Sequence, residues 1–168
     1  MSNSPLAIAV LDFLNLHLPN TLLALGSGAN TLAGSYKNRH PESHIYCCDT
    51  ATPDTRVDLA LVLGYFEYLP KTEAQHVIAR LRDTQAACVL VGVPLGVTQD
   101  GRASAWQVAD FLALGMQLHA QVEQATGTLG LFSYAIHDYK AVPDWLNARY
   151  WAHPARWEPD LTPVFRIA

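Results

Sequence analysis

Two glycines, followed at a distance by an aspartate, have residue types and a spacing that could do chemistry in this chain. The apolar run 21–25, TLLAL, breaks into Gly26, Ser27 and Gly28. At a strand-to-helix turn the first glycine can adopt a positive φ and the second lets the main chain approach a ligand. The helix that follows directs its N–H groups at an anion. Asp49 lies 21 residues after Gly28, where an acidic side chain can accept hydrogen bonds from ribose hydroxyls.

Two other interpretations of this pattern lead to different functions. The third glycine of a dinucleotide fingerprint would fall at Thr31, and a β-branched residue there would hold the helix away from the strand. An NAD or FAD site is therefore not expected. In the second interpretation Gly26 and Gly28 only shape the turn, and Asp49 caps a loop.

Glu67 and Tyr68 are the candidates for catalysis. They follow a second apolar run, VDLALVLG at 57–64, and ligands bind beyond the carboxyl ends of such strands. Each could orient a substrate. Otherwise Glu67 is a solvated loop acid and Tyr68 packs beneath the next helix. No cluster of His, Cys, Asp or Glu has the spacing of a metal site, so no metal is expected.

The candidate residues can lie close together only if the strands that precede them are parallel and end at the same edge of one sheet. The expected strands are, in chain order, 21–25, 44–49, 57–64 and 86–94. Ser4 and Pro5 begin a helix before the first strand, and Ser104 caps a later helix that carries Trp106. Alternating segments on either side of residues 125–128 predict a hairpin. The order predicts an α/β fold, with a doubly wound, mostly parallel sheet, helices on both faces and a C-terminal antiparallel hairpin.

Composition restricts the partners and the location. Half of the 168 residues are hydrophobic, 15% are charged, and the net charge is -4 with no run of Lys or Arg. Nucleic acid and anionic membranes are therefore not expected partners. The three cysteines have no metal-type spacing and are expected as buried thiols of strands. No apolar stretch approaches the roughly 18 residues of a membrane span, so we expect a cytoplasmic protein.

Several segments resemble the Rossmann-like (class I) S-adenosylmethionine-dependent methyltransferases over about residues 5–138. Segment 23–30, LALGSGAN, resembles their first motif, 57–70 their fourth motif, and 89–94 the next strand. The resemblance implies a methyltransferase-like protein that uses S-adenosylmethionine and acts on a small molecule. The cofactor-binding residues that it implies are Gly26, Ser27, Gly28, Asn30, Asp49, Gly64 and Tyr65.

The chain departs from that family at several positions, which favours a second hypothesis. Ala24 stands where the first strand has an acid, Asn30 replaces the last glycine, and Tyr68 replaces a histidine of the fourth motif. Residues 50–56 are too few for the family's helix, strand and helix, so the sheet should be a reduced one that lacks an edge strand. The alternative is a degenerate, non-catalytic fold that serves as a protein-interaction or regulatory module.

We expect a single domain over residues 1–168, with a core at 1–138 and an aromatic tail at 139–168 that packs on it. Residues 133–157 hold three Trp, three Tyr and two His. Such side chains could contact a flat ligand, cover the surface exposed by the missing elements, or form a homodimer interface.

Overall fold

The computed structural model describes residues 4–47, 56–96, 101–124 and 127–136. The chain divides into two units, residues 1–136 and 137–168, and only the first is described below. The predicted tail at 139–168, its packing on the core and the dimer interface expected of it lie outside the described residues, as does Asp49.

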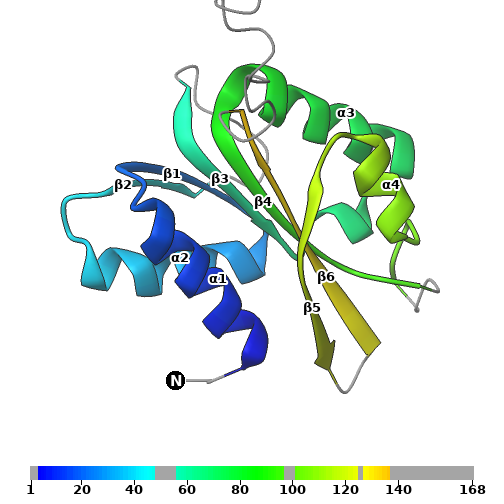
Figure 1. Ribbon diagram of the computed structural model, residues 1–168, viewed down its shortest axis with the longest axis horizontal. Helices are drawn as coiled ribbons and strands as arrows, with labels where there is room; N and C mark the ends of the chain where they lie inside the picture. Colours follow the sequence, from blue (N-terminus) through cyan, green and yellow to red (C-terminus); the bar gives the residue numbers. More distant parts are fainter. Residues whose placement is uncertain (1–3, 48–55, 97–100, 125–126, 137–168) are drawn as a thin grey trace, which may run out of the picture. The chain divides into compact units, whose positions relative to one another are not determined.

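A six-stranded sheet of order β2-β1-β3-β4-β6-β5 organises the first unit (Figure 1). Its strands are β1 (Thr21–Leu25), β2 (His44–Cys47), β3 (Val57–Leu63), β4 (Ala86–Pro94), β5 (Gln117–Gln124) and β6 (Gly127–Ala135). The first four are parallel, β6 runs antiparallel to β4, and β5 and β6 pair as a hairpin. This confirms the predicted fold class. Among the described residues no strand lies beyond β2, which agrees with the loss of an edge strand.

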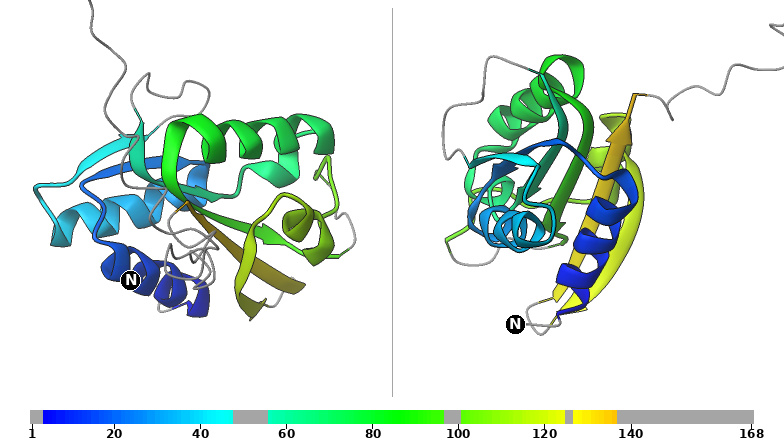
Figure 2. Two further views of the ribbon diagram at one scale, coloured as in Figure 1. Left: turned by 45° about the horizontal axis from the view of Figure 1, so that its top comes forward. Right: turned by 90° about the vertical axis from the view of Figure 1, so that its left-hand side faces the viewer.

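Helices cover both faces of the sheet (Figure 2). They are α1 (Pro5–His17), α2 (Ser27–Arg39), α3 (Lys71–Arg80) and α4 (Val108–Ala113). Alternate residues of each strand face opposite sides, so Leu22 packs with the α1 and α2 residues and Leu23 with those of α3 and α4. Two apolar layers therefore form, one on each face.

Local signals explain how the first elements begin. The Ser4 hydroxyl caps α1 by accepting a hydrogen bond from the Ala7 N–H at 3.3 Å. The Asp58 carboxylate accepts hydrogen bonds from the N–H groups of Asn20 and Thr21, each at 2.9 Å, and the Thr21 hydroxyl accepts one from the Asp58 N–H at 2.8 Å. These bonds join the amino ends of β1 and β3 in register.

The predicted start of α4 is wrong. The helix begins after Gln107, whose side chain and that of Asp110 form a reciprocal capping box. Ser104 does not cap it. Its hydroxyl donates a hydrogen bond to the Phe66 carbonyl at 3.0 Å, and Trp106 is fully buried before the helix.

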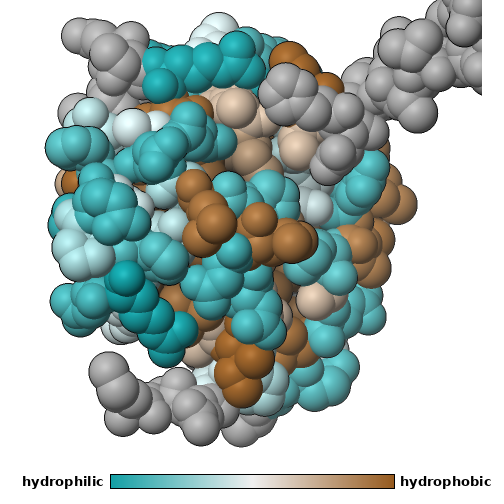
Figure 3. All heavy atoms as spheres, turned by 60° about the vertical axis from the view of Figure 1, so that its left-hand side comes forward, coloured by the Kyte–Doolittle hydropathy of each residue, from teal (hydrophilic) through white to brown (hydrophobic). Residues whose placement is uncertain are grey.

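The cysteines and the surface show two further features. Cys88 is buried in β4 as predicted, but Cys47 is exposed on the edge strand β2. On the face shown in Figure 3, hydrophobic side chains gather between hydrophilic ones. None of the helices in the described ranges combines the length and the apolar character needed to cross a membrane.

Candidate functional site

The turn between β1 and α2 lies directly against the end of β3. Gly26 has φ 91° and ψ 160°, a conformation that is almost restricted to glycine. A Cβ on Gly26 would lie 2.4 Å from the Leu63 carbonyl oxygen, and one on Gly28 would lie 3.2 Å from the Leu63 Cβ. Gly26 is therefore required by the close approach of the two segments, whether or not a ligand is bound, and a Cβ on Gly28 would be a tight contact.

No side chain of the described residues caps the N-terminus of α2. Gly26 is the N-cap residue and supplies no side-chain cap, and the first helical hydrogen bond runs from the Asn30 N–H to the Gly26 carbonyl at 3.0 Å. The amides of the first turn have no intrahelical acceptor, and they lie at the positive end of the helix dipole. The exposed Ser27 adds a hydroxyl there. This end of α2 is suited to a carboxylate or another anion.

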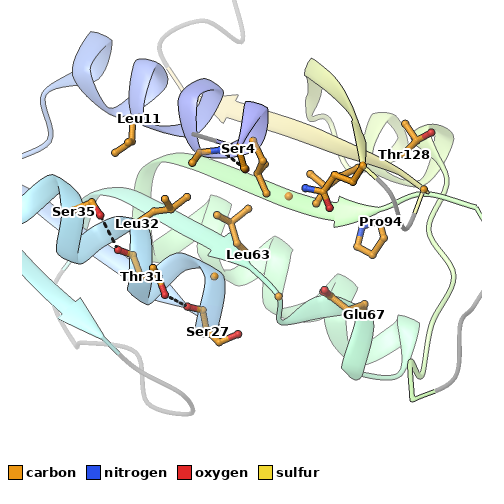
Figure 4. A pocket seen from close by; sticks show the side chains of 18 of the residues that line it. Ser4, Leu11, Ser27, Thr31, Leu32, Ser35, Leu63, Glu67, Pro94 and Thr128 are labelled. Carbon is orange, nitrogen blue, oxygen red and sulfur yellow. Dashed lines mark hydrogen bonds between the residues drawn. The ribbon is translucent and has the colours of Figure 1, made fainter. Parts of the chain in front are cut away.

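A cavity of about 780 Å³ opens beside this turn (Figure 4). Helices α1 and α2 line one part of it, and the ends of β3, β4 and the β5–β6 hairpin line the other. Its residues are Ser4, Leu6, Ala7, Leu11, Ser27, Gly28, Thr31, Leu32, Ser35, Asn38, Arg39, Leu63, Gly64, Glu67, Gly92, Pro94, Arg102, Gln124, Gly127, Thr128 and Leu129. The space lies at the carboxyl ends of parallel strands, where ligands bind in α/β sheets.

Glu67 contributes a buried carboxyl group to this cavity. It lies in the 3₁₀ turn Phe66–Tyr68 after β3 and is only 6% exposed. Its carbonyl accepts hydrogen bonds from the N–H groups of Ala103 and Ser104, which hold the following loop over the turn. Its Oε2 has no hydrogen-bond partner among the described residues. Burial raises the pKa of Glu67, against the opposing effects of nearby backbone N–H groups and of Arg102.

The structure brings together four of the predicted site residues. Ser27, Gly28, Gly64 and Glu67 all line the cavity, although Ser27 and Glu67 come from different elements. Thus Glu67 is a buried acid of the cavity, not a solvated one.

The other predicted residues lie outside the described lining of the cavity. Gly26 is buried, and Asn30 has a buried Oδ1 that finds no partner among the described residues. Tyr65 packs against Phe66, with ring centroids 5.6 Å apart. Tyr68 is 58% exposed, so it does not pack beneath the next helix.

Most residues of the cavity wall were not predicted from the sequence. Leu11 and Leu32 lie on α1 and α2, and in the sequence their apolar character indicates only a helix face that packs on a sheet. Arg102 reaches the cavity because the backbone of the next residues binds Glu67. No local pattern marks Arg102, since this contact joins segments about 35 residues apart.

Comparisons with known proteins agree with this architecture. A family model described as "Family of unknown function (DUF6231)" matches residues 5–160. No curated protein matches the sequence.

Solved structures show the fold in more detail. Magnesium protoporphyrin IX methyltransferase (ChlM) from Synechocystis PCC 6803, with bound SAH, is 11% identical, with a TM-score of 0.54 over 76% of this chain and 80% of that one. LaPhzM is 12% identical, with a TM-score of 0.55 over 78% of this chain and 54% of that one. The methyltransferase domain of bacterial CtHen1 is 13% identical, with a TM-score of 0.50 over 76% of this chain and 97% of that one. The described unit therefore has a class I methyltransferase-like fold.

Proposed function

The chain belongs to DUF6231, a family of unknown function, and we propose that it binds S-adenosylmethionine and transfers the methyl group to a small molecule. The observation that carries this proposal is the cavity of about 780 Å³ beside the uncapped N-terminus of α2. The solved structures of similar fold support it, because that of ChlM contains SAH.

The residues present fit such a donor in size and in chemistry. Pockets for drug-sized ligands measure about 300–1,000 Å³, and this cavity falls within that range. The amides of the first turn of α2 and the hydroxyl of Ser27 suit the donor's carboxylate. Gly64 lines the same region from the end of β3. The roles of Asp49 toward the ribose and of Asn30 and Tyr65 toward the donor are part of the proposal.

Methyl transfer from such a donor requires few catalytic groups from the protein. The donor supplies a methyl group that its sulfonium charge already activates. The protein then has to bind the two reactants, orient them and exclude water, and such positioning is a large part of catalysis. Glu67 can accept a proton or a hydrogen bond within the cavity, whereas Tyr68 would need a ligand that reaches the surface.

Isothermal titration calorimetry with S-adenosylhomocysteine tests the proposal. Ser27→Asp places a carboxylate at the first position of α2, where it favours the helix but repels the carboxylate of the ligand. We expect the unsubstituted protein to bind and Ser27→Asp to bind about ten- to a hundredfold more weakly, which corresponds to the loss of a charge-assisted hydrogen bond. Ser35→Asp is the matched control, because Ser35 lines the cavity from two turns further along α2. Equal affinities of the two variants would contradict the proposed carboxylate site.

A second candidate function is the degenerate module without donor binding. It is favoured by the packing of the glycine turn, because a Cβ on Gly26 would meet the Leu63 carbonyl oxygen and one on Gly28 would lie tightly against Leu63. Packing thus explains this turn without a ligand. The second function is also favoured by Ala24, which leaves β1 without an acid at this edge. No heat with S-adenosylhomocysteine, S-adenosylmethionine or adenosine would support this function and contradict the first.

A further inference from the structure

We propose that the Glu67 end of the cavity binds the hydroxyl group of an apolar small molecule, an alcohol or a phenol. This inference rests on the proposed function in one respect: the bound molecule would then be the methyl acceptor. The hydroxyl site itself is argued from the cavity.

The Glu67 carboxyl group has one buried oxygen that lacks a hydrogen-bond donor among the described residues. The residue is 94% buried, since only 6% of its surface is exposed, and its Oε2 has no partner among the described residues. A buried polar atom without a hydrogen bond is costly, and such atoms in native proteins call for a partner. Figure 4 shows the Glu67 side chain directed into the cavity, so a ligand can supply the donor.

Apolar side chains form a large part of the cavity wall. Leucine and alanine side chains from both helices and from β3 and β6 line the cavity; they are Leu6, Ala7, Leu11, Leu32, Leu63 and Leu129. Pro94 lies at the same end as Glu67 in Figure 4. A ligand that fills this space must bury an apolar body, and it needs few polar groups to fix its orientation.

The charged side chains that line the cavity favour a hydroxyl group over an ammonium group as the ligand's polar group. Glu67 is the only acidic residue among the described residues that line the cavity, and Arg39 and Arg102 line it too. Arg102 also acts electrostatically on the Glu67 carboxyl. The described wall therefore has one more positive than negative side chain, which disfavours a cation. A neutral donor satisfies Glu67 without adding charge.

Three probes with one apolar body test the inference. 4-Propylphenol carries the hydroxyl group, 4-propylanisole replaces its hydrogen by a methyl group, and 4-propylbenzylamine carries a cation. Dissociation constants are measured by ligand-detected NMR for the unsubstituted protein, Glu67→Gln and Glu67→Met. Asn38→Ala is the control, because it removes a polar side chain that lines another part of the cavity. Thermal melting checks that each variant is folded.

We expect the unsubstituted protein and Asn38→Ala to bind the phenol about ten- to a hundredfold more tightly than the anisole, as for a hydrogen bond to a charged acceptor. The preference should shrink in Glu67→Gln, which keeps a neutral acceptor, and vanish in Glu67→Met. Equal binding of phenol and anisole, a preference that survives in Glu67→Met, or tightest binding of the amine would overturn the inference.

The test separates this inference from the proposed function. If the phenol preference depends on Glu67 but S-adenosylhomocysteine does not bind, the hydroxyl site stands and the methyl-transfer proposal fails. If S-adenosylhomocysteine binds but no phenol preference is found, only the hydroxyl site is wrong.

Discussion

Replacing Gly26 by alanine should destabilise the protein strongly, because the added Cβ would meet backbone on the neighbouring strand. That Cβ would lie 2.4 Å from the Leu63 carbonyl oxygen and 2.8 Å from the Gly64 carbonyl oxygen. The backbone conformation, φ 91° and ψ 160°, adds strain of about 1–3 kcal/mol for a residue with a side chain. Overpacking adds about 1–3 kcal/mol. We therefore expect the free energy of unfolding to fall by about 2–6 kcal/mol, a large part of the typical total of about 5–15 kcal/mol.

Urea denaturation followed by circular dichroism measures this loss, and Gly34→Ala is its matched control. Gly34 lies inside α2, the helix that follows Gly26. It is exposed and has no atom within 4 Å of the position of an added Cβ. Alanine there should increase the free energy of unfolding by about 0.5–1 kcal/mol, because glycine is a poor helix former. The two substitutions are thus expected to have opposite signs. A Gly26→Ala protein as stable as the unsubstituted one would refute the argument that the turn needs glycine for packing on β3.

Two further predictions concern residues that line the cavity. Burial raises the pKa of Glu67, so this carboxyl keeps its proton to higher pH in the folded protein than in the unfolded chain. Its contribution to stability is full below the pKa of an unfolded glutamate and is lost as pH rises through the folded pKa. Glu67→Gln should remove that decline in urea denaturation at a series of pH values, and an unchanged profile would contradict it. Ser4→Ala removes the cap of α1 and should lower the free energy of unfolding by about 1 kcal/mol, whereas no loss would mean that the capping bond to Ala7 contributes little.

The central strands could be predicted from the sequence because each is an almost unbroken apolar run. The predicted bounds of 21–25 and 86–94 agree with those of β1 and β4. A strand that is buried on both faces has no polar alternation, and its flanking turn residues mark where it ends. The hairpin β5–β6 was predictable for a different reason, since its alternating residues lie on either side of a glycine-containing turn.

Of two helix caps predicted from local pattern, Ser4 is confirmed and Ser104 is wrong. Ser104 has the residue type of a helix cap, but its hydroxyl binds the Phe66 carbonyl, 38 residues away. Gln107 caps α4 in its place. The role of Ser104 is thus determined by a long-range contact, which its neighbours in the sequence do not indicate.

The candidate site could be predicted only where its residues belong to a local pattern, and not where long-range contacts form it. Ser27 and Gly28 follow a strand and begin a helix, and both features are visible in the sequence. The burial of Glu67 depends on the loop that carries Ala103 and Ser104, and the apolar wall depends on how α1 packs beside α2. These are tertiary contacts, which composition and spacing do not encode.

Packing on β3 explains the glycine turn, so the glycines themselves are not evidence for a bound ligand. Because Gly26 is required by its contact with the backbone of Leu63 and Gly64, its substitution would disturb the fold and the site together. A bound donor is therefore supported by the uncapped amides at the start of α2 and by the exposed Ser27. A bound hydroxyl group is supported by the Glu67 Oε2, which has no partner among the described residues. Each can be altered by a substitution that preserves packing. Ser27→Asp thus tests donor binding and Glu67→Gln tests hydroxyl binding while the glycine turn stays unchanged, which a substitution of Gly26 cannot do.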